Sequence, residues 1–178
     1  CYEKKGNLDL ALQFFKYFFH EDPLLDKGWV AITDFYIRQN DPKNALVYVK
    51  KALKIDNNNL KYWLRYGSIN YQLRNFDEAH FGYNKAVELG DSQLETWIHL
   101  VDVLYQLGEI QIAINTLILA TNYFPDSSEI AYRMAGFYYT LDKTAKGKTN
   151  LIKGLDLNYK KNSIIERFFP IVWEKKSV

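Results

Sequence analysis

Tryptophan recurs at a fixed interval in this sequence. Trp29, Trp63 and Trp97 are evenly spaced, with a period of about 34 residues. A domain built around one core has no reason to repeat itself in register. Stacked units do, because each unit must bury the same face against its neighbours. The period therefore predicts an array of repeated structural units.

Small residues keep the same phase as the tryptophans. An alanine follows each tryptophan after 16 residues, and a second alanine follows after seven more. These six residues are Ala45, Ala79, Ala113, Ala52, Ala86 and Ala120. Small side chains let helix backbones approach closely, and a bulky residue there would overpack the contact at a cost of roughly 1–3 kcal/mol. Residues three, four and seven positions apart share a helix face, so Trp63, Tyr66, Gly67 and Asn70 are expected to form one packing stripe.

This pattern resembles the tetratricopeptide signature. In that family Trp, Leu, Gly and Tyr mark the first helix of a unit, Ala, Phe and Ala mark the second, and Pro closes the unit. Pro23 and Pro125 hold the closing position, and Asn57, Asp91 and Tyr159 replace it in other units. The resemblance runs without insertion or deletion from about residue 6 to residue 159. It implies an all-α fold, a right-handed superhelical solenoid of helix–turn–helix hairpins.

The phase of the repeat predicts one array over residues 1–178. The predicted parts are a half repeat at 1–25, full repeats at 26–59, 60–93 and 94–127, a degenerate repeat at 128–161 and a C-terminal capping helix at 162–178. In the degenerate repeat, Ala131 replaces the tryptophan, and Gly147 and Gly154 replace the packing alanines. Each glycine inside a helix costs about 1 kcal/mol relative to alanine, so this repeat is expected to be the least stable.

The ends of the chain suggest a larger parent protein. The helical register begins almost at Cys1, which favours a fragment of a longer protein over a lipidated N-terminus, and the abundance of Asn, Tyr and Lys fits a bacterial source. Phe168 and Phe169 leave more apolar surface than a solvated cap needs, which suggests self-association through the C-terminal end or contact with a partner. The compartment stays open between the cytoplasm, slightly favoured, and a bacterial envelope. No segment approaches the roughly 18 consecutive apolar residues of a membrane span.

In the tetratricopeptide family, the first helices line a concave face where partners usually bind. The resemblance places the binding positions one, two, five, eight and nine residues after the tryptophan position. Position eight is mostly aromatic and position two is mostly cationic. The predicted partner-binding residues are Asp34, Ile37, Arg65, Tyr71, His99, Asp102, Tyr105, Arg133 and Tyr139.

Two interpretations of these positions follow. In the first, the aromatic rings supply rigid apolar area, and the arginines donate charge-assisted hydrogen bonds to a bound peptide. In the second, Arg65 pairs with Asp34 on the neighbouring helix, and Arg133 pairs with Asp102 in the same way. Some family members hold the acidic tails of heat-shock chaperones with a carboxylate clamp of Lys and Asn. Here Val30 and Asp34 occupy those clamp positions, so such tails are expected not to bind.

The sequence gives no strong signal for catalysis, a cofactor or a metal. Residues 147–149, Gly-Lys-Thr, resemble the end of a phosphate-binding loop, but the first glycine of such a loop is replaced by Asp142. His20, His80 and His99 lack metal-ligand spacing. Near-neutral charge, 23 basic and 21 acidic residues, argues against a nucleic-acid groove.

The predicted function is a non-enzymatic scaffold or adaptor that binds a protein or peptide partner in its concave groove. The first alternative is a regulatory or substrate-positioning region of a larger enzyme. Nucleic-acid binding is the third interpretation, and steep salt dependence of binding would support it.

Overall fold

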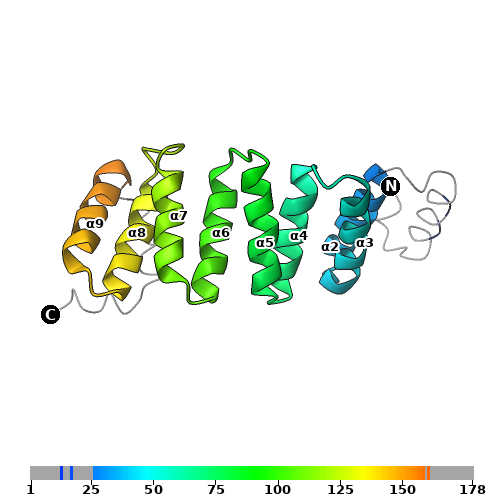
Figure 1. The fold of residues 1–178 in the computed structure, drawn as a ribbon, viewed down its shortest axis with the longest axis horizontal. Helices are drawn as coiled ribbons and strands as arrows, with labels where there is room; N and C mark the ends of the chain where they lie inside the picture. The colour runs from blue at the N-terminus through cyan, green and yellow to red at the C-terminus, as the bar shows by residue number, and fades with distance from the viewer. Residues whose placement is uncertain (1–12, 14–16, 18–25, 159, 161–178) are drawn as a thin grey trace. The chain divides into compact units, whose positions relative to one another are not determined.

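The computed structural model describes residues 13, 17, 26–158 and 160 (Figure 1). In residues 26–158 the chain forms eight α-helices. Their bounds are α2 Asp26–Arg38, α3 Pro42–Ile55, α4 Leu60–Gln72, α5 Phe76–Glu88, α6 Leu94–Gln106, α7 Ile110–Ala120, α8 Ser128–Thr140 and α9 Thr144–Asn158. The predicted half repeat at 1–25 and the capping helix at 162–178 lie outside the described residues, apart from Gln13 and Tyr17.

The helices pair into hairpins. The chain divides into two compact units, Cys1–Asp91 and Ser92–Val178. In the first unit α2 packs on α3, α4 packs on α5, and α3 also contacts α4. In the second unit α6 packs on α7, α8 packs on α9, and α7 contacts α8. The first helices of the four hairpins begin at Asp26, Leu60, Leu94 and Ser128, which are evenly spaced in the sequence. The predicted all-α fold of helix–turn–helix hairpins is confirmed.

The turn inside each hairpin has the same backbone geometry. One residue in each turn has a positive φ angle: Asn40 at 56°, Arg74 at 60°, Gly108 at 79° and Asp142 at 55°. The amide of the next residue reaches back to a carbonyl five residues earlier, as Asp41 does to Tyr36 at 2.9 Å. This arrangement satisfies carbonyls that the helix end would otherwise leave unpaired. Only one of these four turns uses glycine, so the sequence did not reveal this repeated feature.

The small residues of the repeat lie where the helices meet. All six alanines of the pattern are fully buried, at 0% exposure. Tyr66, Gly67 and Asn70 of the predicted stripe are buried as well, and Trp63 is half-buried. A Cβ atom added to Gly82 on α5 would lie 2.7 Å from the backbone nitrogen of Gly67 on α4. Any side chain at position 82 would therefore push these two helices apart.

The degenerate repeat packs in a way that explains its glycines. A Cβ atom at Gly154 would lie 2.8 Å from ring carbons of Tyr132, which is fully buried on α8. A Cβ atom at Gly147 would lie 3.0 Å from the ring of Tyr139. Tyrosine rings thus occupy the space that alanine methyl groups need. The glycines lower helix propensity, but each one allows a ring to pack against the α9 backbone.

Candidate interaction face

The nine predicted partner-binding residues all lie on the first helices of the hairpins. Their positions are Asp34 and Ile37 on α2, Arg65 and Tyr71 on α4, His99, Asp102 and Tyr105 on α6, and Arg133 and Tyr139 on α8. We call them the inner positions. Within the first unit the structure brings Asp34 and Arg65 together, and within the second unit it brings Asp102 and Arg133 together.

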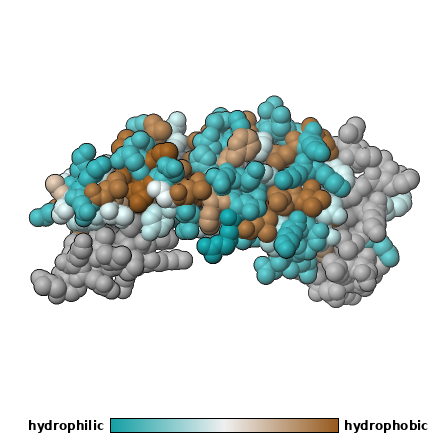
Figure 2. Space-filling model, turned by 60° about the horizontal axis from the view of Figure 1, so that its bottom comes forward, coloured by the Kyte–Doolittle hydropathy of each residue, from teal (hydrophilic) through white to brown (hydrophobic). Residues whose placement is uncertain are grey.

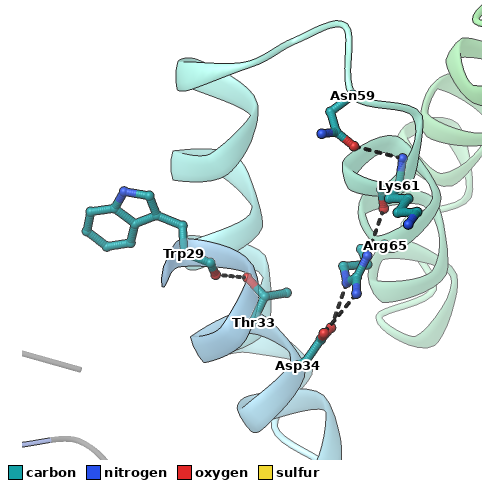
Figure 3. A network of polar contacts seen from close by, with 6 residues as sticks. All are labelled: Trp29, Thr33, Asp34, Asn59, Lys61 and Arg65. Carbon is teal, nitrogen blue, oxygen red and sulfur yellow. Dashed lines mark hydrogen bonds and ion pairs between the residues drawn. The ribbon is translucent and has the colours of Figure 1, made fainter. Parts of the chain in front are cut away.

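The pair in the first unit is bidentate (Figure 3). Arg65 donates from Nε to Oδ1 of Asp34 at 2.6 Å and from its NH2 group to Oδ2 at 2.8 Å. Its NH1 group donates to the backbone carbonyl of Lys61 at 3.3 Å. The hydrogen bonds to Asp34 raise the pKa of Arg65. The guanidinium is therefore fixed in direction, and its charge is balanced by the carboxylate.

Local structure holds the two partners in place. Asn59 caps α4 by accepting a hydrogen bond from the Lys61 amide at 3.2 Å, which starts the helix one turn before Arg65. On α2, Thr33 Oγ1 donates to the carbonyl of Trp29 at 2.7 Å. Figure 3 shows the Trp29 ring pointing away from Asp34, so packing and pairing use different sides of α2.

The pair in the second unit is more deeply buried. Arg133 donates from its NH1 group to Oδ1 of Asp102, and from Nε and NH2 to Oε1 of Glu129, both at 3.3 Å. The Arg133 side chain is 4% exposed, whereas that of Arg65 is 28% exposed. Burial raises the pKa of Asp102, and the charge of Arg133 opposes that shift. Here two carboxylates share one buried guanidinium.

Both arginines thus pair as the second interpretation of the sequence predicted. Each pair joins the first helices of consecutive hairpins, 31 residues apart in sequence. The sequence interpretation missed Glu129 as a second partner of Arg133. A signal for it existed, because residues four apart are neighbours on a helix surface and Glu129 precedes Arg133 by four.

The aromatic inner positions differ in exposure. Tyr71 is 37% exposed and its ring meets Phe76 edge-on, with ring centres 5.7 Å apart. Tyr105 is 38% exposed and packs against Phe137, also at 5.7 Å. Tyr139 is half-buried, and burial raises its pKa. Two tyrosines at the same repeat position, one in each unit, therefore rest on a phenylalanine while leaving more than a third of their surface in solvent.

The remaining inner positions are Ile37 and His99. Ile37 is half-buried and packs against the core cluster of Ala45, Val49, Tyr66 and Ile69. His99 is exposed on α6, and a positive charge on it would lower the pKa of Asp102. Ile37 thus belongs partly to the core, whereas His99 lies at the surface.

Two further features of the described part concern other kinds of site. Among residues 26–158 and the three others described, no group of three or more His, Cys, Asp or Glu side chains is arranged to hold a metal ion. None of the described helices combines the length and apolar character that crossing a bilayer requires. Residues 147–149, which resemble the end of a phosphate-binding loop, lie within α9.

Comparison with known proteins supports the fold. Residues 27–59 match the family model described as tetratricopeptide repeat. The match covers one hairpin, α2 and α3. Its fold is similar to the crystal structure of MamA, with a TM-score of 0.77 and 19% identity, covering 90% of this chain and 94% of that one. It is equally similar to YrrB, with a TM-score of 0.77 and 19% identity over 93% of this chain and 86% of that one. YrrB is described as a TPR protein with an unusual peptide-binding site.

Three curated relatives share shorter segments of sequence. Human general transcription factor 3C polypeptide 3 is 25% identical over 121 residues, which is 65% of this chain and 14% of the relative. Tetratricopeptide repeat protein 37 of Xenopus laevis is 38% identical over 61 residues, 34% of this chain and 4% of the relative. Human superkiller complex protein 3 is 34% identical over 74 residues, 42% of this chain and 5% of the relative. The chain therefore spans only a small part of the length of each of these relatives.

Proposed function

We propose that this chain is a protein–protein interaction module, a scaffold or adaptor that holds a segment of a partner protein on its inner positions. The observation that carries the proposal is the presence of one half-exposed tyrosine in each unit, Tyr71 and Tyr105. Tyrosine supplies a large, rigid and amphipathic contact area at low cost in conformational entropy, and it is enriched among the residues that dominate binding energy. Phe76 and Phe137 already hold the two rings, so little ordering remains to be done on binding.

The charged inner positions have a different part in this proposal. Asp34 already balances the charge of Arg65, so the pair offers directed hydrogen bonds without a net charge. A guanidinium has five N–H groups, and three of those on Arg65 donate to Asp34 and Lys61. The remaining two suit a backbone carbonyl of the partner. Arg133 is only 4% exposed, so we give it no direct contact with the partner. Its role in the proposal is to position the carboxylate of Asp102.

A protein of the same fold supports the class of ligand. YrrB is described as having a peptide-binding site. A peptide offers both the backbone carbonyls and the side chains that rigid tyrosine rings and an ion-paired arginine can engage. A partner segment of modest charge and apolar character fits the inner positions best. If a catalytic domain proves to belong to the same longer protein, the module would have the regulatory or substrate-positioning role that is the alternative function.

Site-specific cross-linking tests this proposal. A photoreactive benzoylphenylalanine replaces Tyr71 or Tyr105 in the purified chain, which is then irradiated in a lysate of the source organism. The matched control replaces Phe81, which is 48% exposed on the second helix α5. We expect the same partner to be captured from positions 71 and 105 and not from position 81.

A variant completes the test. Tyr71→Ala combined with Tyr105→Ala should lose the partner in a pull-down carried out well below the melting temperature of the variant, which is expected to fall only modestly because more than a third of each side chain is exposed. Capture from position 81 alone would contradict the proposal. So would retention of the partner by the double variant.

A further inference from the structure

The outer surface of α7 differs from that of the other second helices. Ile112 is 48% exposed, Ile118 45%, Leu119 57% and Tyr123, just after the helix, 67%. The exposed polar residues among them are Gln111, Asn115 and Asn122, all uncharged amides. We call these seven residues the α7 outer face. Residues 110–125 contain no acidic or basic side chain, although a quarter of the whole chain is charged.

The opposite side of α7 is already used for packing. Ala113, Ile114, Leu117 and Ala120 are fully buried. The helix is therefore apolar on its buried side, and its outer side is uncharged, with four apolar side chains beside three amides. The exposed side of a helix normally carries charged and polar residues instead. Because α7 is half-exposed, its outer face is suited to a partner surface.

The other second helices carry charge on their exposed sides. The exposed residues of α3 include Lys43, Lys50, Lys51 and Lys54. Those of α9 include Lys146, Lys148 and Lys153, and those of α5 include Asp77, Glu78 and Glu88. On the face shown in Figure 2, hydrophobic side chains form patches among hydrophilic ones. The α7 outer face is thus a local exception among second helices that are otherwise charged.

We propose that the α7 outer face associates with the same face of a second copy of this chain. A two-fold interface places one patch against itself, so any charge near the axis meets a charge of the same sign. The lysines of α3 or α9 would repel their own copies in such a contact. The α7 outer face has no charge of its own. Lys143 reaches its edge by donating to Gln111 Oε1 at 3.0 Å, at the end away from Leu119 and Tyr123.

The polar residues of the face favour self-pairing. An amide side chain both donates and accepts hydrogen bonds, so it can pair with an identical group. Ile112, Asn115, Leu119 and Asn122 follow one another at intervals of three and four residues, the spacing of a seam between two helices. Asparagine in such a seam fixes the register and the number of strands at some cost in affinity. Gln111 already donates to Asn115 Oδ1 at 3.2 Å, which holds that amide in place.

The size of the face sets the expected strength. The 11 residues of α7 make a helix about 16 Å long. Stable interfaces bury about 800 Å² per partner, more than one such helix face provides. We therefore expect a weak dimer with a dissociation constant in the micromolar range. This inference goes beyond the proposed function and does not depend on it, because it uses none of the inner positions.

Sedimentation velocity of the purified chain tests the inference. We expect the weight-average sedimentation coefficient to rise from the monomer value toward the dimer value between roughly 1 and 200 µM. Leu119→Lys should weaken the dimer at least about tenfold, because it puts two like charges into the contact. The matched control is Phe81→Lys on α5, which makes the same charge change at an exposed apolar position and should leave the dimer intact. Circular dichroism melts confirm that both variants fold.

Three outcomes would overturn the inference. The first is a chain that stays monomeric over the whole range. The second is a dimer that Leu119→Lys leaves unchanged, which would move self-association to another surface such as the C-terminal end. The third is a dimer lost equally in both variants. Because no partner protein is present, none of these results depends on whether the inner positions bind a peptide.

Discussion

Arg65 on α4 donates two hydrogen bonds to the carboxylate of Asp34 on α2, at 2.6 and 2.8 Å. Arg133 pairs with Asp102 at the equivalent positions in the second unit, two repeats later. The side chains of the first pair are 28% and 31% exposed, and those of the second are 4% and 21% exposed. The same two residue types at the same repeat positions therefore have different consequences, because burial sets how much an ion pair matters.

The first pair predicts how the chain treats acidic peptides. Because Asp34 balances Arg65, an acidic C-terminal peptide should give no measurable heat in calorimetry at peptide concentrations of roughly 100 µM, which corresponds to binding weaker than about 5.5 kcal/mol. Asp34→Asn removes the competing carboxylate and leaves Arg65 cationic and partly exposed. That variant should gain measurable affinity for the peptide, and the gain should decline with added salt.

The second pair supplies the control. Asp102→Asn makes the same chemical change, but Arg133 is almost fully buried and stays bonded to Glu129. This variant should gain no affinity for the acidic peptide. A micromolar dissociation constant for the unaltered chain would show that the inner positions attract carboxylates despite Asp34 and Asp102.

Removing the buried arginine should destabilise the chain. Arg133→Met leaves Asp102 and Glu129 without their cation in a largely buried place. We expect a loss of about 3 kcal/mol in the free energy of unfolding at pH 7, since breaking a buried ion pair strands the other charge. Arg65→Met, in the half-exposed pair, should lose about 1 kcal/mol or less. Urea titrations of both variants measure the difference, and equal losses would contradict the role given to burial.

The stability lost in Arg133→Met should depend on pH. Burial raises the pKa of Asp102 in the folded chain above its ordinary value of 3.8. Between the unfolded and the folded pKa the native state binds more protons, so this group's contribution to stability is lost as pH rises through that window. Arg133 opposes the shift, so its removal raises the pKa of Asp102 further. The loss caused by Arg133→Met should therefore be largest at pH 7 and shrink toward about pH 4. A loss independent of pH would exclude Asp102 as its source.

The sequence predicted most of the fold because packing between hairpins repeats. The tryptophan spacing anticipated four first helices that begin at equal intervals, and the six alanines proved fully buried. Such positions are visible in sequence because each hairpin has to meet its neighbours in the same way. The contact between Gly154 and Tyr132 could not be predicted from the sequence. Gly154 departs from the repeat pattern, and the Tyr132 ring that it meets lies on another helix.

The sequence predicted which helices carry the nine inner positions, but not how exposed their side chains are. The repeat phase placed all nine inner positions on first helices, yet it gave the same weight to Arg65 and Arg133. Their exposure differs because exposure depends on what surrounds each helix, and sequence spacing carries no such information. The α7 outer face was also missed, since its distinguishing mark is the absence of charge over residues 110–125, which no motif describes.

The glycines of the degenerate repeat give a matched pair of substitutions. Gly154→Ala improves helix propensity by about 1 kcal/mol. Its new methyl group would meet the ring of Tyr132, which is fully buried and held by a hydrogen bond from its hydroxyl to the carbonyl of Asn158 at 2.9 Å. Overpacking of roughly 1–3 kcal/mol should outweigh the gain, so the free energy of unfolding falls.

Gly147→Ala is the comparison. The ring that its methyl group meets belongs to Tyr139, which is only half-buried and has room to move. This variant should be near neutral or slightly more stable in the same urea titration. If Gly154→Ala proved as stable as Gly147→Ala, the buried ring would not be the reason for glycine at position 154.

The repeated tryptophans should differ in their contribution to stability. Trp97 is 6% exposed, and its ring packs against Tyr123 with ring centres 5.5 Å apart. Trp63 is half-buried, between Tyr66 and Phe81, and its Nε1 donates to the carbonyl of Asn57 at 2.7 Å. Trp97→Ala should cost about 3–5 kcal/mol, because a buried side chain leaves a cavity that the helices cannot close. Trp63→Ala should cost less, since part of its site already faces water.

A third variant separates the cavity from the aromatic contact. Trp97→Phe keeps a ring beside Tyr123 and fills part of the space, so it should recover more than half of the stability that Trp97→Ala loses. Urea titrations with both fluorescence and circular dichroism report the unfolding of the whole chain rather than of one hairpin. A loss below about 1 kcal/mol for Trp97→Ala would remove the packing role from the residue whose spacing defines the repeat. A loss of the predicted size would place that role on the tryptophan ring itself, and the regular interval would then follow from one packing requirement met in each hairpin.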